Sequence, residues 1–320
     1  MGRKPVLSSS VQRYPDAERY ETAFVGARVE VLPTQRGAFT ARSVRVVFNR
    51  LWIALGEESG PCIKHLTQVP MRAFITFLTR PGSEVLIDGL AMPPAGVMRH
   101  SPAHTYHERS TGATFRGAMS LPVEDMAEAG DAIAGCDLTP PRDTLRVTPP
   151  IAAMAKLLRL HAEASALAEA QPAVVTDPEV ARSLEQSLVE AVVKCLGDPK
   201  PNEETWAHRC HETIMRRFRR VLEENPDRPL YIPEICAAIS VPERTLRLCC
   251  HEHLGMSPKK YLLLRRISLA QRALRTASPD AMTVTEIATQ FGFWHFGRFS
   301  AAYRSVFGEL PSVTLNRTPN

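Results

Sequence analysis

A helical pattern that occurs twice in the last third of the chain sets narrow limits on how this part can fold. Apolar residues spaced three and four apart predict a short helix over 232–239, and Ser240-Val241-Pro242 ends it before a second helix from about Glu243. The same order returns about 50 residues later, where an apolar stripe over 284–291 stops at Gly292. A short helix, a tight break and a second helix form a helix-turn-helix, so the sequence predicts two such units.

The second helix of each unit carries a polar outer face that suits DNA. Arg244, Arg247 and His251 share one face of the first helix, at steps of three and four residues. In the second helix, expected from about His295, Arg298 faces outward. An α-helix fits the major groove, where an Arg side chain can donate two parallel hydrogen bonds to guanine. We expect the DNA contacts to come from Arg244, Thr245, Arg247, Leu248, His251, His295, Arg298, Ser300 and Arg304.

A long helix is expected over 259–274, between the two units. Such a rigid spacer lets two reading helices enter successive turns of the major groove, about 34 Å apart on one face of the DNA. The charge distribution agrees, because residues 227–320 hold 12 Lys and Arg against 7 Asp and Glu and account for the +5 of the whole chain. A separately basic module favours an anionic partner, of which nucleic acid is the commonest.

The first 130 or so residues favour β-structure. Short runs rich in β-branched and aromatic residues occur over 27–32, 43–48 and 72–78. Turn residues separate the runs, as at Pro33-Thr34 and Pro81-Gly82-Ser83. Many short strands at near-regular spacing predict a closed or folded-over antiparallel sheet, which is a β-barrel or a β-sandwich.

Helical periodicity replaces the strand pattern in the middle of the chain. Helices are expected from Ile151 onward, over 178–196 and over 203–222, and residues 223–229 form the clearest linker. The predicted fold class is therefore α+β. Its parts are a β-barrel or β-sandwich domain over 1–135, a helical connector over 136–225, and an all-α double helix-turn-helix domain over 226–320.

Composition excludes several other classes of protein. The seven cysteines are odd in number and include no C-x-x-C pair, so neither a disulfide framework nor a zinc knuckle is expected. No run approaches the roughly 20 apolar residues that cross a bilayer, and the N-terminus lacks the apolar run of a secretory signal. We therefore expect a cytoplasmic protein that has no membrane partner.

A set of residues in family-like order and spacing runs through both helical units. Its members are Ile235-Cys236, Leu246, Gly255-Met256-Ser257-Pro258, Tyr261-Leu262, Arg266-Ile267, Ala270, Leu274, Val284-Thr285-Glu286-Ile287-Ala288, Gly292-Phe293, Phe299-Ser300, Tyr303-Arg304 and Phe307-Gly308-Glu309-Leu310-Pro311. With these residues, the segment from about 230 to 315 resembles the DNA-binding domain of the AraC/XylS family of bacterial transcription regulators. It departs from the family at Pro242, Cys249-Cys250 and Ala301. Because Ala301 stands where Arg is frequent, the second unit is expected to read bases less strongly.

The resemblance implies a sequence-specific transcription regulator that binds double-stranded promoter DNA. Activation through RNA polymerase is implied as well. The N-terminal domain is expected to be cupin-like and to sense a small-molecule effector or to form a homodimer. No cofactor, metal or enzymatic activity is expected. A DNA-binding adaptor whose first domain only dimerises, with no ligand, stays open as an alternative.

A second alternative is a metal-dependent cupin enzyme with a DNA-binding tail. Its ligands would be His100, His104 and His107, with Glu108 beside them. The His-x-His pair with a following Glu, typical of metal-binding cupins, is missing, and Ser101-Pro102-Ala103 favours a loop. We therefore expect loop or core histidines rather than a metal site.

Further predictions concern single side chains. Trp294 is expected in the core, and Cys249-Cys250 is expected to be buried as small hydrophobes rather than to act as a redox pair. Arg265 is expected to touch phosphates or solvent, whereas Arg266 is placed to pair within the domain. Four arginines of the β-region permit an acidic ligand, although most strand arginines are solvated: Arg42, Arg45, Arg50 and Arg80.

Overall fold

The structure is a computed structural model of the chain. It describes residues 7–25, 27–67, 71–102, 105–197, 206–225 and 228–317, with the backbone alone over 206–209. Within these ranges every helix is too short or too polar to span a bilayer.

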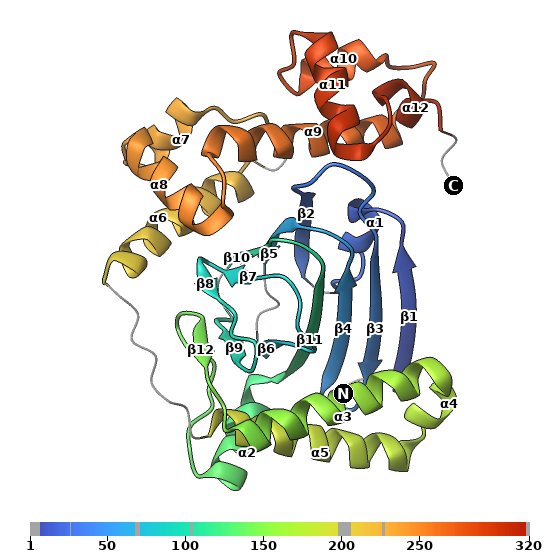
Figure 1. The fold of residues 1–320 in the computed structure, drawn as a ribbon, viewed down its shortest axis with the longest axis vertical. Helices are drawn as coiled ribbons and strands as arrows, with labels where there is room; N and C mark the ends of the chain where they lie inside the picture. Colours follow the sequence, from blue (N-terminus) through green and yellow to red (C-terminus); the bar gives the residue numbers. More distant parts are fainter. Residues whose placement is uncertain are drawn as a thin grey trace, which may run out of the picture.

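Two antiparallel sheets that pack face to face form the N-terminal half (Figure 1). One sheet has the strand order β1-β3-β4-β11-β6-β9-β12 and the other the order β2-β5-β10-β7-β8. This sandwich confirms the predicted β-class. The strands are β1 Ser8–Tyr14, β2 Arg28–Pro33, β3 Ala41–Val47, β4 Trp52–Glu58, β5 Cys62–Thr67, β6 Arg72–Leu78, β7 Val85–Ile87, β8 Leu90–Ala91, β9 Val97–His100, β10 Thr105–Ser110, β11 Thr114–Pro122 and β12 Leu145–Val147.

The seven-stranded sheet is covered on both faces, and β3 shows the consequence for the sequence pattern. Val44 and Val46 belong to the core that this sheet shares with the helices of the middle segment. Ser43 and Arg45, which alternate with them, point into the space between the two sheets. Because both faces of the strand are largely covered, the usual alternation of apolar and polar residues is incomplete.

The helices of the middle segment pack on the outer face of the seven-stranded sheet (Figure 1). The helix predicted over 178–196 is present with those limits, and the Asp177 carboxylate caps it by accepting the backbone N–H of Glu179. Ile151 is 88% exposed because it lies in the first turn of its helix. The helices up to this point are α1 Ala17–Glu21, α2 Val123–Ala134, α3 Ile151–Ala170, α4 Pro172–Val175 and α5 Pro178–Leu196.

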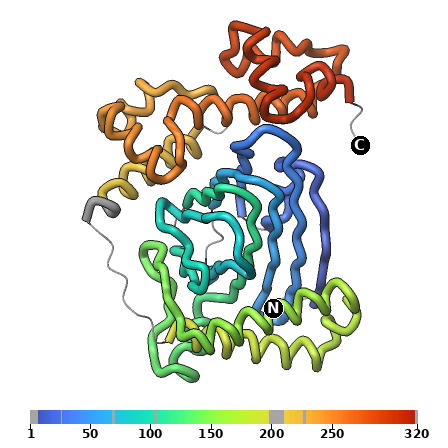
Figure 2. Tube along the Cα trace, viewed as in Figure 1, coloured from blue at the N-terminus to red at the C-terminus, as the bar shows by residue number. Residues whose placement is uncertain are grey.

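The remaining helices build two small cores joined by α9. One core holds α6, α7, α8 and the first part of α9, and the second holds the rest of α9 with α10 to α12. The trace of α9 runs from one core to the other (Figure 2), which confirms the two predicted helix-turn-helix units and their spacer. The helices are α6 Trp206–Glu223, α7 Ile232–Ile239, α8 Glu243–Leu254, α9 Pro258–Thr276, α10 Val284–Gln290, α11 Phe296–Phe307 and α12 Pro311–Leu315.

Local chemistry explains both breaks within the units. Helix α7 ends at Ser240, which takes a left-handed conformation with a φ of 55°. Helix α10 begins with a capping box between Thr283 and Glu286. After α10 the chain turns at Gly292, whose φ is +75° and where a Cβ would lie 2.9 Å from the hydroxyl of Tyr231. Only glycine meets both requirements there.

Helix α6 packs with the first helix-turn-helix unit. Met215 and Phe218 of α6 share a core with α7 and α8, and Leu32 and Ile63 of the five-stranded sheet join it. The sandwich and the C-terminal helices therefore share one apolar interface. The domain limits at residues 135 and 225 stay predictions, and this packing favours a division before α6.

Candidate nucleic-acid interface and interior pocket

Helix α8 turns its predicted basic face to solvent. The residues exposed on this face are Arg244, Arg247, Leu248 and His251, with Thr245 half-buried beside them. The opposite face is sealed, because Leu246 and Cys249-Cys250 are fully buried. Burial raises the pKa of the Cys250 thiol. The cysteines therefore lie in the core as predicted, in a setting that disfavours the reactive thiolate.

Arg244 and Arg247 differ in what holds them in place. Arg247 Nη2 donates to Glu243 Oε1 at 2.8 Å, one turn earlier on the helix. Arg244 has no acidic partner among the residues that the structure describes. An exposed pair within a helix contributes only about 0.3–0.5 kcal/mol, so Arg247 can exchange its partner for DNA at low cost. Both guanidinium groups are available to a ligand.

Helix α11 presents the second face in the same way. Its exposed residues include Arg298, Ala301 and Arg304, with His295 exposed at the N-cap and Ser300 half-buried. Phe299 and Tyr303 face the core, and Tyr303 Oη lies 2.7 Å from Thr314 Oγ1. The nine predicted contact residues thus gather on two helices. Their contact with DNA stays a prediction.

The prediction that Trp294 lies in the core is wrong. Phe291, Phe293 and Phe299 already fill the core around it, and the Trp294 side chain is 70% exposed. Phe296, at the start of α11, is also exposed. The N-terminal end of a recognition helix is the part that approaches base edges. Both rings therefore belong to the candidate interface, although Trp294 was expected in the core and Phe296 was not among the predicted contacts.

Two adjacent arginines of α9 donate hydrogen bonds to backbone carbonyls within the protein. Arg265 is buried and donates to the carbonyl oxygens of Leu222 at 3.2 Å and Asn225 at 3.1 Å. The prediction that it touches phosphates or solvent is wrong, because it closes the C-terminal end of α6. Arg266 does pair within the domain, since Nη1 donates to the carbonyl of Gly292 at 3.4 Å.

The candidate metal-binding histidines do not converge. The ring of His100 lies inside the sandwich, 2.8 Å from Thr76 Oγ1, and burial lowers its pKa to about 3. The ring of His107 faces the C-terminal helices, where Nε2 lies 3.2 Å from the Tyr261 hydroxyl. His104 is outside the described residues, and within them no three His, Cys, Asp or Glu side chains gather as a metal site would require.

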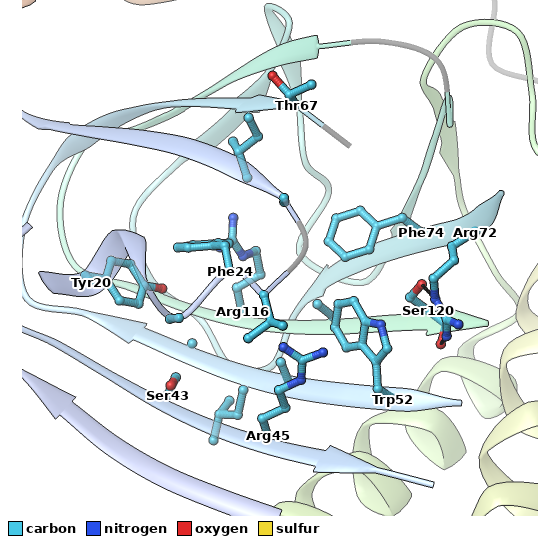
Figure 3. A pocket seen from close by; sticks show the side chains of 18 of the residues that line it. Tyr20, Phe24, Ser43, Arg45, Trp52, Thr67, Arg72, Phe74, Arg116 and Ser120 are labelled. Carbon is cyan, nitrogen blue, oxygen red and sulfur yellow. Dashed lines mark hydrogen bonds between the residues drawn. The ribbon is translucent and has the colours of Figure 1, made fainter. Parts of the chain in front are cut away.

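Inside the sandwich, side chains from both sheets and from the α1 region surround a mostly apolar pocket of about 100 Å³ (Figure 3). The lining residues that matter for its chemistry are Tyr20, Phe24, Arg45, Trp52, Phe74 and Tyr106. Aromatic walls with a few polar groups are typical of small-molecule sites.

A network of buried charges lies against this pocket. Lys64 Nζ lies 2.6 Å from Glu108 Oε1 and also contacts Glu58, and Arg116 pairs with the same two carboxylates. Burial would raise the pKa of Glu58, but Lys64 and Arg116 lower it to about 2. Tyr20 Oη donates to Glu58 Oε1 at 2.9 Å. The cations of this network are therefore already neutralised.

Arg45 lies in the pocket without such neutralisation. Its guanidinium carbon lies 4.9 Å from the ring centroid of Trp52, Nε has no hydrogen-bond partner, and burial lowers its pKa. Arg72, by contrast, donates to the carbonyl of Ser120 at 2.7 Å. The expectation that strand arginines are solvated is thus wrong for Arg45. The other three pair with acidic side chains away from the pocket: Arg42, Arg50 and Arg80.

A known protein family matches the helical C-terminal part of the chain. Residues 235–317 match a family described as a helix-turn-helix domain. Over 103 residues the chain is 37% identical to the XylDLEGF operon transcriptional activator of Pseudomonas putida. These residues make up 31% of this chain and 32% of that protein. The C-terminal domain is an AraC/XylS-type helix-turn-helix domain. The match spans about a third of this relative's length.

The chain is also similar to a further curated protein and to two solved structures. The probable thc operon regulatory protein of Rhodococcus erythropolis is 35% identical over 106 residues, which are 33% of this chain and 32% of that protein. Among solved structures, the AraC-like transcriptional activator CuxR covers 82% of this chain and 95% of its own, at 16% identity and a TM-score of 0.42. The match to a probable AraC family transcriptional regulator from Rhodopseudomonas palustris covers 34% of this chain and 99% of that chain, at 31% identity and a TM-score of 0.31.

Proposed function

We propose that the protein is a sequence-specific DNA-binding transcription regulator that reads the major groove through α8 and α11. The observation that carries this proposal is the pair of exposed basic faces on two helices that a single helix, α9, connects. We also propose that it acts in the cytoplasm, without enzymatic activity, and that it activates transcription by contact with RNA polymerase. Dimerisation through the N-terminal half is a further expectation of the AraC/XylS resemblance.

Within each face, the central residues are placed to select the DNA sequence, and the residues at the rim are placed to add affinity. Arg244 and Arg247 stand one turn apart on α8, so both can reach base edges from one groove, and Arg can bridge guanine O6 and N7. Residues at the rim of each face, such as Arg304, are placed for phosphates, which set position and affinity but not sequence. Release of counterions from the DNA makes this affinity depend strongly on salt.

Selection from a random pool of duplexes by the full-length protein tests the proposal. We expect enriched sites that contain two recognised segments about one helical turn, or 10 bp, apart, because α9 connects the two reading helices rigidly. The enriched duplexes should also lose affinity steeply as salt rises. A pool that shows no enrichment after repeated rounds would overturn the proposal.

Arg304→Gln tests the predicted phosphate contact. The affinity should fall by a similar factor on the selected site and on unrelated DNA, and the slope of log K against log salt should become shallower by about 1. Arg220→Gln is the matched control, because this exposed arginine lies on α6, outside both reading helices, and should leave the slope unchanged. A change in the preferred base sequence would show that Arg304 reads bases instead.

We propose further that the interior pocket binds the effector, and that this effector is a small organic acid with an apolar body. The aromatic walls suit the apolar body, while the Nε of Arg45 lacks a partner in a half-buried setting. An unpaired, partly desolvated cation is costly, and a carboxylate would satisfy it. The sensor proposal differs from the adaptor alternative, in which the sandwich only dimerises.

Arg45→Met separates these two alternatives. We expect butanoate, hexanoate or cyclohexanecarboxylate to raise the melting temperature of the native protein, and the matching amides to raise it much less. Methionine keeps the apolar stem and removes the cation, so the variant should lose the preference for acid over amide. Equal shifts by acid and amide would show that Arg45 does not bind the carboxylate, and the absence of any shift would favour the adaptor.

A further inference from the structure

The two reading helices share one register, so their exposed faces can be compared position by position. Helices α8 and α11 each contain 12 residues, and each ends at a glycine in the left-handed conformation. The fourth residue of each helix is buried, Leu246 in α8 and Phe299 in α11. The repeat of the helix-turn-helix unit therefore extends to single positions of the two faces.

The two faces differ in the side chains that they hold at equivalent positions. The second, fifth and sixth positions carry long side chains in α8 and short ones in α11: Arg244, Arg247 and Leu248 against Gly297, Ser300 and Ala301. A face without long side chains lets the helix backbone lie closer to a ligand. Helix α8 therefore offers guanidinium groups at its centre, whereas the centre of α11 offers little beyond its own backbone and a methyl group.

Gly297 is not explained by the packing of the protein itself. A Cβ at this position would meet no atom of the described residues within 4 Å, and the residue does not have a positive φ. Glycine inside a helix lowers stability relative to alanine, and close approach of the backbone to a ligand is one reason to retain it. Its place in the first turn of α11 agrees with a helix that enters the groove deeply.

Two large rings stand at the same end of α11. The side chain of Trp294 is 70% exposed and that of Phe296 is 40% exposed, while Phe293 and Phe299 fill the core behind them. Large apolar groups that gather on a surface mark a contact site for a partner. With the methyl group of Ala301, also exposed, these rings make the reading face of α11 largely apolar.

The major groove restricts what such a face can recognise. Every base pair presents hydrogen-bonding groups there, but thymine adds an apolar one, its 5-methyl group. Apolar side chains such as alanine and phenylalanine contact this methyl group in protein–DNA complexes. Guanine, by contrast, presents the two acceptors that an arginine can bridge. The apolar face of α11 and the arginine face of α8 therefore suit different bases.

We propose that α11 recognises thymine through its 5-methyl group, with Trp294, Phe296 and Ala301 as the apolar contacts, while α8 recognises guanine through its arginines. This inference rests on the proposed regulator function and adds which base each helix selects. Arg298, exposed on α11, stays available for a further base or a phosphate. The DNA site is then asymmetric, with one segment that depends on guanine and another that depends on thymine.

Replacing thymine by uracil in the selected duplex tests this inference with the full-length protein. Uracil lacks the methyl group and keeps the hydrogen-bonding groups of thymine. The variant Arg244→Ala/Arg247→Ala identifies the segment under α8, because the base preference should relax there. Uracil in the other segment should lower the affinity about fourfold for each contacted methyl group, which is the effect of burying one such group. Uracil under α8 should change the affinity much less.

Trp294→Ala/Phe296→Ala connects the thymine preference to the two rings. This variant should bind the thymine and uracil duplexes with nearly equal affinity. Trp294→Ala alone, which removes a mostly exposed ring and leaves the core intact, should lose part of the preference. The matched control is Ile133→Ala, because this exposed apolar residue lies on α2, outside the reading helices, and should leave the preference unchanged. Melting temperatures show whether each variant is folded.

Two results would overturn the inference and leave the regulator proposal intact. One is a selected site that binds equally well with thymine or uracil in the α11 segment. The other is a double variant that loses affinity equally on selected and scrambled duplexes and still prefers thymine, which would show that the rings pack on deoxyribose. A random pool without any enriched site would instead defeat the regulator proposal, and the inference with it.

Discussion

Replacing Asp88 by Asn lowers the free energy of unfolding by about 3 kcal/mol or more. Asp88 is buried in the turn after β7, where it pairs with Arg219 of α6, whose side chain is only 1% exposed. Removing one partner of a buried ion pair leaves the other charge without compensation, which costs about 3–5 kcal/mol. Asn isolates this effect, because it tolerates the positive φ of 49° and still accepts the backbone N–H of His107.

Urea unfolding of the full-length protein measures the effect. The control is Glu224→Gln, which breaks the exposed pair between Arg220 and Glu224 and should cost less than about 1 kcal/mol. Adding Arg219→Met to Asp88→Asn should recover much of the loss, since the stranded cation is then gone. Equal losses for Asp88→Asn and the control would show that water reaches Arg219 and screens it.

This ion pair also illustrates what the sequence does not reveal. Asp88 and Arg219 lie 131 residues apart, and neither belongs to a motif or a periodic stripe. Their pairing follows from the docking of α6 onto the five-stranded sheet. It therefore depends on tertiary packing, which local sequence patterns do not show. By contrast, α5 was predictable, because Asp177, Pro178 and a regular apolar stripe are all local signals.

Arg45 and Trp294 show two further limits of sequence patterns. Arg45 alternates with Val44 and Val46, so the strand looks like one with a solvated face. Its polar face points instead between two sheets, and no local pattern distinguishes solvent from an internal pocket. Trp294 follows an aromatic residue that does fill the core, and only the packed volume decides which ring remains outside.

The candidate interface was more accessible to prediction than the pocket. A recognition helix needs a buried face and an exposed basic face at helical spacing, and the periodicity of a short stretch of sequence predicts both. Arg244 and Arg247 therefore lie where their spacing from Leu246 and Cys249 places them. Which of them reads a base depends on the DNA sequence that α8 meets.

Arg244→Ala/Arg247→Ala should produce the largest functional loss of any double substitution on the two faces. Each bidentate contact to guanine contributes about 1–3 kcal/mol of discrimination, so the affinity for the selected site should fall by that amount per residue. Both side chains are exposed, and Arg247 gives up only a weak surface pair, so stability should barely change. Competition binding with the selected duplex and with scrambled duplexes measures the loss.

The comparison between duplexes decides the role of the two arginines. If they read bases, the variant loses affinity for the selected site far more than for scrambled DNA, and its preference at the contacted base pairs relaxes. Arg220→Gln/Arg228→Gln removes the same charge elsewhere and should preserve that preference. An equal loss on all duplexes would show that Arg244 and Arg247 bind only phosphates, and sequence choice would then have to come from α11, with Arg298, Trp294 and Phe296 as the groups to test.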